Sequence, residues 1–379
     1  MIYKPSDVQE TGVRVLRSSN INEDTFVCGN DDVFVNPKTV NIDTVKQNDI
    51  LITSANGSSR LVGKHALIKG IPNESAIHGG FMLLGRTKNY DFINASMNSS
   101  WYIRFINIYV TGGNGAIGNL SKSDLDEQLI LVPSDLEQKK IGVYFANLDH
   151  LITLHQQKIT LLTKLKKAML EKMFPKKGSV IPEFRFNGFA NAWEQRKLGD
   201  VLERRIEQRQ QSKEYPRLAF ASGQGVIPLS ERKTNNREQL TKDEYTKKYL
   251  VTELNDIVYN PANVKYGAID RNKCGRGLIS PIYVTFTTSE ISGFIERIVT
   301  SHDFQQRALR FEEGTVTKRQ SVNPEDLVTL DILVASKREE QQKIATYFDY
   351  LDNLITLHQR KIDKIKNMKK AMLDQMFIY

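Results

Sequence analysis

The sequence predicts an α+β protein in which two mixed α/β blocks are each followed by a long helix, so that the chain is an internal repeat with pseudo-two-fold symmetry. Two observations predict this fold. First, residues 137–174 and 340–377 match each other at a constant offset of 203, with 23 identities in 38 positions. Second, each of these segments is preceded by short apolar runs that alternate with turns, which is typical of strands.

The two matched segments are predicted to be helices because their apolar residues recur at alternating steps of four and three, the spacing of a coiled coil. Such a helix spans about 55 Å at 1.5 Å per residue and cannot bury its apolar stripe alone. We therefore expect the two copies to pair antiparallel along their length, with His155 opposite Ile362 and Ile159 opposite His358. The predicted seam consists of Ile141, Phe145, Leu148, Ile152, His155 and Ile159, and of Ile344, Phe348, Leu351, Ile355, His358 and Ile362.

The elements before each helix follow one order. We place the first block at residues 1–135, its helix at 136–175, the second block at 176–335 and its helix at 336–379. Residues 123–133 and 324–335 match as a polar turn and a short apolar strand that leads into each helix. Strands are predicted at 13–21, 48–68, 79–87, 255–263 and 277–288, and helical stretches at 90–110 and 291–311.

Composition excludes several classes of protein. Two cysteines are too few for a disulfide framework or a cysteine-rich zinc site, and the six histidines show no metal-ligand spacing. No stretch approaches eighteen consecutive apolar residues, and the first thirty residues carry acidic side chains where a signal peptide needs an apolar core. These features favour a cytoplasmic protein with no membrane partner and no bound metal.

A formal charge of +9 favours a polyanionic partner. Between Arg204 and Arg276 there are fifteen lysines and arginines against nine acidic residues, so this stretch alone contributes +6. Much of that charge falls in predicted loops, where Arg, Lys, Asn and Gln can donate to phosphates and base edges. The alternative is that these loops are simply solvated.

Catalytic motifs are incomplete. Residues 220–225 and 260–263 imitate, in order, the cofactor loop and the NPP-aromatic motif of amino-group DNA methyltransferases. The first has an extra residue before its glycines, and the second lacks the aromatic side chain that would stack on a flipped base. A methyltransferase therefore remains an alternative, as does a coiled-coil scaffold that binds proteins. A catalytic pair is one interpretation of the matched His155 and His358, but each is better explained as a polar seam residue that fixes helix register at some cost in stability.

The residues carry a resemblance to a known family. PEFRFNGFANAWEQRKLGDV at 182–201, a variable block, and a helix with EQQKIA, LDxLITLHQ and KKAMLxxMF elements resemble the specificity subunit of a type I DNA restriction and modification enzyme. The resemblance implies two target-recognition domains, each reading half of a bipartite site in double-stranded DNA, joined by antiparallel helices that set the gap between half-sites. The segment at 182–201 has no counterpart before the first block, which is therefore expected to lack its leading segment.

The resemblance also implies the partners. The chain itself is expected to be non-catalytic and to bind no cofactor. Two modification subunits would dock on it and use S-adenosylmethionine, and restriction subunits would add chemistry driven by ATP and Mg. The repeated starts of the two helices suggest a duplicated docking surface at Tyr144, Phe145, Tyr347 and Phe348.

The residues predicted to contact DNA lie in turns flanked by strand signals, where side chains can leave a sheet. In the first block they are Arg17, Ser18, Asn56, Arg60, Lys64 and Asn114. In the second block they are Arg232, Lys233, Lys265, Arg271, Lys273, Arg276, Lys318 and Arg319.

Overall fold

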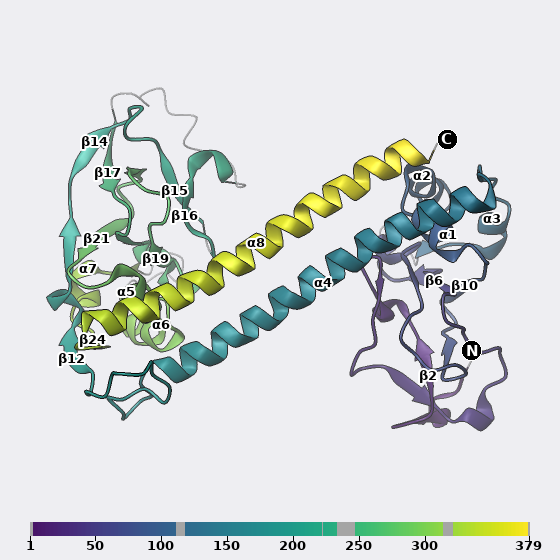
Figure 1. Cartoon of the computed structure of the whole chain (residues 1–379), viewed down its shortest axis with the longest axis horizontal. Coiled ribbons are helices and arrows are strands. Elements are labelled where there is room, and N and C mark those ends of the chain that lie inside the picture. The colour runs from purple at the N-terminus through teal and green to yellow at the C-terminus, as the bar shows by residue number, and fades with distance from the viewer. Residues whose placement is uncertain (1–2, 111–117, 222, 233–246, 314–320, 378–379) are drawn as a thin grey trace. The chain divides into compact units, whose positions relative to one another are not determined.

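A computed structural model describes residues 3–110, 118–221, 223–232, 247–313 and 321–377 (Figure 1). The chain divides into two compact units, and each is described by itself. Unit 1 comprises residues 1–158 and 358–379, and unit 2 comprises residues 159–357. The division crosses both long helices, so each unit contains part of each helix.

Unit 1 is built from small sheets that helices cover. One sheet has the order β1-β5-β2-β9, in which β2 and β9 are parallel, and a second has the order β10-β6-β8. Helix α1 packs beside β8, and Phe105 of α2 is buried in the same core as Ile50 and Ile52 of β6. The described elements are β1 (Val8–Gln9), β2 (Val13–Leu16), β3 (Ile21–Asn22), β4 (Thr25–Phe26), β5 (Val33–Val35), β6 (Ile50–Thr53), β7 (Ala55–Asn56), β8 (His65–Leu67), β9 (Ala76–His78), β10 (Met82–Gly85), α1 (Tyr90–Ser96), α2 (Ser100–Tyr109), β11 (Gly118–Asn119) and α3 (Lys122–Asp126).

Unit 2 has a similar plan with longer strands. Its sheets have the orders β13-β21-β18-β19 and β14-β17-β20, with separate pairs β15-β16, β12-β24 and β22-β23. The main core lies between the first sheet and α5, α6 and the long helices. The described elements are β12 (Glu194–Lys197), β13 (Leu202–Arg205), β14 (Gln208–Gln210), β15 (Leu218–Ala221), β16 (Gly225–Pro228), β17 (Lys248–Thr252), β18 (Ile257–Tyr259), β19 (Ile269–Arg271), β20 (Gly277–Ile279), β21 (Val284–Thr288), α5 (Ser292–Val299), α6 (His302–Ala308), β22 (Glu312–Glu313), β23 (Ser321–Val322), α7 (Pro324–Leu327) and β24 (Asp331–Val334).

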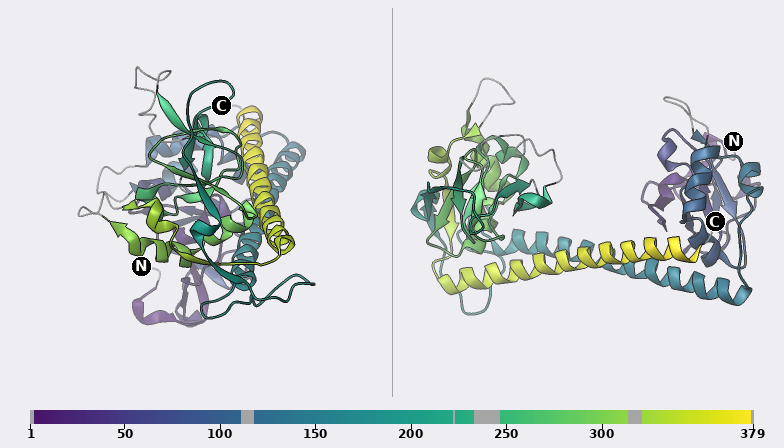
Figure 2. Two further views of the ribbon diagram at one scale, coloured as in Figure 1. Left: turned by 90° about the vertical axis from the view of Figure 1, so that its left-hand side faces the viewer. Right: turned by 90° about the horizontal axis from the view of Figure 1, so that it is seen from above.

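The two long helices are α4 (Asp135–Met173) and α8 (Arg338–Met376), each of 39 residues. In unit 1 the start of α4 packs antiparallel against the end of α8, with Phe145 and Leu148 in one core with Leu373 and Phe377 (Figure 2). In unit 2 the end of α4 packs against the start of α8, and Leu162 and Met173 share a core with Phe348. The predicted helices are therefore confirmed.

Most predicted elements are present, and one is wrong. The strand runs contain β2, β6, β8, β10, β18, β20 and β21, and the helical stretches contain α1, α2, α5 and α6. The matched strands ahead of the helices differ, however. Ile332–Leu333–Val334 lies in β24 and pairs with β12, whereas the identical Ile130–Leu131–Val132 has no regular structure. A short strand needs a neighbour to satisfy its backbone, and none of the described residues pairs with this one.

Each long helix meets its own block through a close contact that includes a glycine. In unit 1 a Cβ added to Gly142 of α4 would lie 2.8 Å from the backbone nitrogen of Phe92. At the matching position in unit 2 the helix carries Ala345, and the small residue is Gly293 of α5, whose added Cβ would lie 3.0 Å from that of Ala345. The glycine thus stands on the helix in one unit and on the block in the other.

Candidate nucleic-acid interface

Three predicted DNA contacts of the first block line one cavity. Arg17 and Ser18 follow β2, Asn56 is in β7, and a third wall is formed by the Gly79–Gly80–Phe81 turn before β10. The cavity has a volume of about 840 Å³. Asn56 Nδ2 donates to Ser18 Oγ at 3.0 Å, which fixes the amide against the β2 end.

The arginine of this cavity is only partly satisfied. Arg17 Nη2 donates to the backbone oxygen of Asp31 at 2.7 Å, while its Nε is buried without a hydrogen-bond partner among the described residues. A guanidinium fork beside glycine backbone and a half-buried amide is suited to phosphate oxygens or to a base edge. Phe81 adds a largely exposed aromatic ring to the rim.

The other predicted contacts of the first block are dispersed. Arg60 is exposed in the short helix Ser59–Leu61, and Lys64 is half-buried just before β8. Asn114 lies outside the described residues. The structure therefore brings together Arg17, Ser18 and Asn56, and it places Arg60 and Lys64 in the adjoining turn region between β7 and β8.

The basic residues of the second block are mostly paired with carboxylates. Arg276 is exposed and donates to Glu253 and Glu214, both at 2.9 Å. Lys265 pairs with Glu312 at 3.3 Å, and Arg232 is half-buried. Exposed ion pairs of this kind are worth about 0–1 kcal/mol, so Arg276 can exchange its carboxylates for phosphates at little cost. Lys233, Lys318 and Arg319 lie outside the described residues.

Arg271 has a structural environment that the prediction of a DNA contact did not anticipate. Its guanidinium lies between the second block and α8. It donates to Glu296 of α5 at 2.7 Å and to the two carboxylate oxygens of Asp349 of α8 at 2.7 and 2.8 Å. Its side chain is only 12% exposed. Lys273, on the same turn, remains exposed at 46% although it also reaches Glu296 at 2.6 Å. We therefore leave Arg271 out of the DNA-contacting set, because its donors are already used to join β19 to α5 and α8.

The seam carries a polar pair at its repeated histidine. His155 Nδ1 lies 2.9 Å from His358 Nδ1, a contact that our pairing of each histidine with an isoleucine did not include. Only one of the two nitrogens can donate, so at least one ring must be unprotonated there. Burial lowers the pKa of His358, and His155, Lys361 and Lys158 lower it further. The pair is suited to fixing register and shows no arrangement typical of catalysis.

The sequence did not reveal two matched ion pairs beside the seam. Lys166 Nζ lies 2.5 Å from Asp352, and Lys369 Nζ lies 2.7 Å from Asp149. The repeat offset converts one pair into the other, because Lys166 matches Lys369 and Asp149 matches Asp352. Both helices share a Leu–Asp dipeptide, and its aspartate was the sequence signal for these ion pairs. The lysine that pairs with each aspartate is distant in the sequence, and only the antiparallel pairing of the helices brings lysine and aspartate together.

The four residues predicted to dock modification subunits occupy two environments. Phe145 and Phe348 are 1% and 0% exposed, inside the cores of units 1 and 2, where they act as seam residues. Tyr144 and Tyr347 are half-buried on the helix surface. Only the tyrosines are therefore accessible to a partner.

The incomplete methyltransferase motifs do not occupy a cofactor-site fold. Phe220 and Ala221 end β15, and the chain turns through Gly223 into the antiparallel β16, so no strand, glycine loop and helix follow in order. The residues 260–263 begin a short 3-10 helix, Pro261–Tyr266. Among the described residues no group of three or more His, Cys, Asp or Glu could hold a metal ion, and no helix is long and apolar enough to cross a membrane.

Comparison with known proteins identifies the family. A family model described as type I restriction modification DNA specificity domain matches residues 13–164 and 191–367. The putative type I restriction enzyme MjaX specificity subunit of Methanocaldococcus jannaschii is 24% identical over 349 residues, covering 86% of this chain and 76% of that protein. The crystal structure of the type I restriction-modification system S subunit from M. genitalium has the same fold, with a TM-score of 0.62, 12% identity and coverage of 99% of this chain and 94% of that one. Because the family model covers both halves of the sequence, the chain belongs to the family of type I restriction-modification specificity subunits.

Proposed function

We propose that this chain is the DNA-reading subunit of a type I restriction-modification complex and that each block recognises one half of a bipartite site in double-stranded DNA. The observation that carries the proposal is the duplication: two mixed α/β blocks, each matched by the specificity-domain model, end in helices of 39 residues each. Two readers connected by paired helices impose a fixed spacing on the two half-sites, as dimeric DNA-binding proteins do.

In the first block the proposed reading surface is the cavity with Arg17, Ser18 and Asn56, together with Arg60 and Lys64 beside it. The partly exposed guanidinium of Arg17 supports this choice, because the fork of donors on a guanidinium is a ready partner for a base edge or a phosphate. In the second block the proposed contacts are Arg232, Lys233, Lys265, Lys273, Arg276, Lys318 and Arg319.

We assign the chemistry to partner subunits. Two modification subunits would supply methyl transfer from S-adenosylmethionine, and restriction subunits would supply the steps that require ATP and Mg. The chain itself would be non-catalytic and act in the cytoplasm. Leu154 and Leu357 support a duplicated docking surface, because they match under the repeat offset and are 45% and 47% exposed on the two helices. An accessible apolar side chain in the same place in both copies suits two identical partners.

The reading surface is tested by DNA binding of the complex assembled with its modification subunits. The double variant Arg60→Ala/Lys64→Ala is expected to weaken binding about 10-fold or more and to reduce the slope of log affinity against log salt by about one to two, since each phosphate contact contributes about one counterion. The matched control is Lys38→Ala/Lys46→Ala, which removes the same charge from exposed positions of the same unit.

Equal losses in the two double variants would mean that general charge and not this surface binds DNA, and they would remove the assignment. The wider proposal has a separate test. Transfer of labelled methyl groups to DNA by the purified chain without partners would contradict a non-catalytic subunit.

A further inference from the structure

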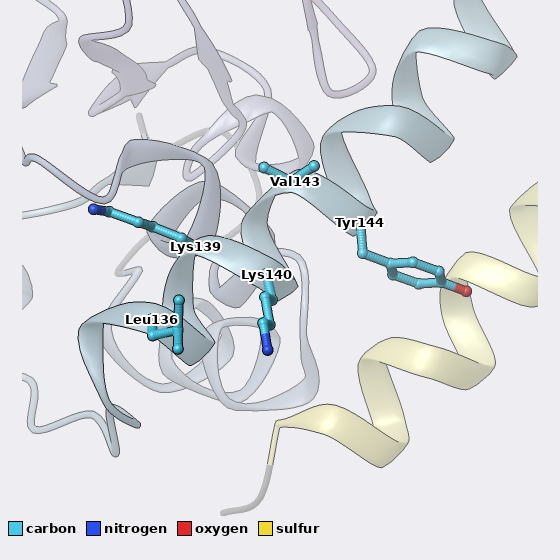
Figure 3. Close-up of a pocket in the computed structure, with 5 residues that line it drawn as sticks. All are labelled: Leu136, Lys139, Lys140, Val143 and Tyr144. Atoms are coloured by element: carbon cyan, nitrogen blue, oxygen red, sulfur yellow. The ribbon is translucent and has the colours of Figure 1, made fainter.

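The two copies of the repeat differ in what covers the start of the long helix. In unit 2 the segment between α4 and β13 lies on the start of α8 and on β24. In unit 1 the matching surface, at the start of α4, is open and forms a groove of about 390 Å³ lined by Leu136, Lys139, Lys140, Val143 and Tyr144 (Figure 3). Because the two helices match at a constant offset, each residue that makes a contact on the covered surface has an identifiable counterpart on the open surface.

The covering segment of unit 2 makes an ion pair with the first turn of α8. Arg185 Nε and Nη2 donate to the two carboxylate oxygens of Glu340 at 2.8 and 2.6 Å, and both side chains are nearly buried. The residue that matches Glu340 under the repeat offset is Glu137, which is exposed in unit 1.

The same segment then places two aromatic rings on the next turn of α8. Phe186 packs edge-on against Tyr347 with ring centroids 6.2 Å apart, and Lys343 Nζ lies 5.0 Å from the ring centroid of Phe189. The matching residues are Tyr144 and Lys140, and both line the open groove of unit 1.

The segment ends in the strand that β24 requires. β12 pairs antiparallel with β24, and Trp193, just before β12, is 3% exposed beside Phe174 and Phe294. Val334 in β24 is 2% exposed under this cover, whereas the identical tripeptide of unit 1 leaves Leu131 and Val132 exposed at 73% and 54%. An exposed apolar run with unpaired backbone is a template for strand addition.

We propose that the surface formed by residues 128–144 is a docking site for a polypeptide segment that repeats the pattern of residues 185–198: an arginine, two phenylalanines, a tryptophan and a short strand. The occupant comes from outside the 379 residues, because the chain's own segment is buried in unit 2. Exchange with a second copy would uncover β24 of that copy and gain nothing. The arginine pairs with Glu137, the aromatic rings enter the groove at Lys140 and Tyr144, and the strand pairs with Ile130–Val132.

The test uses a fluorescent peptide with the sequence of residues 184–201 and the full chain. We expect saturable binding at one peptide per chain, measured by anisotropy, and new amide protection of residues 128–132 in hydrogen exchange. The chain variant Glu137→Arg is expected to bind at least 10-fold more weakly, and a peptide with Arg185→Glu is expected to restore binding to that variant. Leu161→Ala, which changes an exposed position of α4 outside the site, is the matched control and keeps wild-type binding.

Three outcomes would overturn the proposal. The first is no binding of the peptide by a chain whose circular dichroism is that of the folded protein. The second is binding that Glu137→Arg leaves unchanged, which places the peptide elsewhere, for example on β24 by exchange. The third is a dimer in light scattering whose residues 128–144 are already protected, which identifies a second copy as the occupant.

Discussion

Units 1 and 2 fix the same pair of helices to different blocks with very different amounts of buried charge. In unit 2 the Lys166–Asp352 pair continues into Arg297, whose Nη2 lies 2.9 Å from both Asp349 and Asp352 and whose Nη1 donates to Glu296 at 3.1 Å. Arg271 adds its bonds to Glu296 and Asp349. Two arginines of the second block thus form ion pairs with the helix carboxylates Asp349 and Asp352.

In unit 1 the equivalent pair is supported less extensively. Lys369 contacts Asp149 at 2.7 Å and Asp24 at 3.7 Å, and the block contributes that one aspartate to it. Burial raises the pKa of Asp149 in spite of the ion pair with Lys369. The difference teaches that the repeat supplies only the lysine and aspartate of the helices, while each block supplies different groups to pair with them.

The strongest test of this comparison is to remove one buried cation from each unit. Arg297→Met should destabilise unit 2 by about 3–5 kcal/mol, because it leaves Glu296, Asp349 and Asp352 short of a donor. Lys369→Met should cost unit 1 less, about 1–3 kcal/mol, because Asp149 is already disposed to take up a proton. Hydrogen exchange in α5 and in α1 reports the two units separately. A larger loss in unit 1 would contradict the comparison.

A second test concerns a carboxylate that weakens unit 2. Burial raises the pKa of Asp270 to about 6, with Glu296 adding to the effect and Lys273 opposing it. The folded state therefore holds this proton more tightly than the unfolded state, so the cost of the carboxylate appears as pH rises through about 6. We expect Asp270→Asn to stabilise unit 2 by about 1 kcal/mol at pH 7.5 and by clearly less at pH 4.5, which lies much closer to the unfolded pKa of about 3.9.

The control for this prediction is Asp349→Asn, which removes the acceptor of two arginines and should destabilise unit 2 at both pH values. Urea denaturation at the two pH values measures the effect. Equal effects of Asp270→Asn at pH 4.5 and pH 7.5 would show that the carboxylate does not titrate as its burial requires.

The smallest expected effect lies at the matched histidines, where His155 of one helix contacts His358 of the other. The lowered pKa of His358 means that the folded state favours the neutral ring, so its contribution is complete above the usual histidine pKa of about 6.5 and is lost as pH falls through the folded value. The thermal midpoint of helix unfolding by circular dichroism should fall between pH 8 and pH 5.5 by more in the wild type than in His358→Leu. An identical pH dependence in both proteins would show that the pair does not titrate.

The repeat made the helices and most strands predictable, because identical residues at a constant offset and a four-and-three spacing are local signals. The prediction failed where the outcome depended on a distant segment. Ile130–Val132 has the composition of a strand, and its failure to form one follows from the lack of a neighbour like β12. Arg271 is a residue type that commonly contacts DNA. Its burial follows from its hydrogen bonds to Glu296 and Asp349, which are 25 and 78 residues away in the sequence.

The candidate site was predictable in part for the same reason. Arg17, Ser18 and Asn56 were chosen as turn residues, and their convergence on one cavity depends on sheet pairing that the sequence does not specify. The Gly79–Gly80–Phe81 wall was missed, although a glycine pair followed by an aromatic residue between two strand signals marks a turn that exposes both backbone and ring.

The matched positions 142 and 345 carry glycine in the first helix and alanine in the second, and this difference limits how the blocks and helices can be recombined. A block that presents Asp91 and Phe92 tolerates only a helix with glycine at this contact, whereas a block that presents Gly293 accepts alanine. A chimera that joins the second block to the first helix start is sterically permitted, since glycine fits wherever alanine does. The reverse chimera places a methyl group against backbone. The exchange of recognition modules is therefore directional, and an engineer who builds new specificities from this chain must carry the helix start along with the first block.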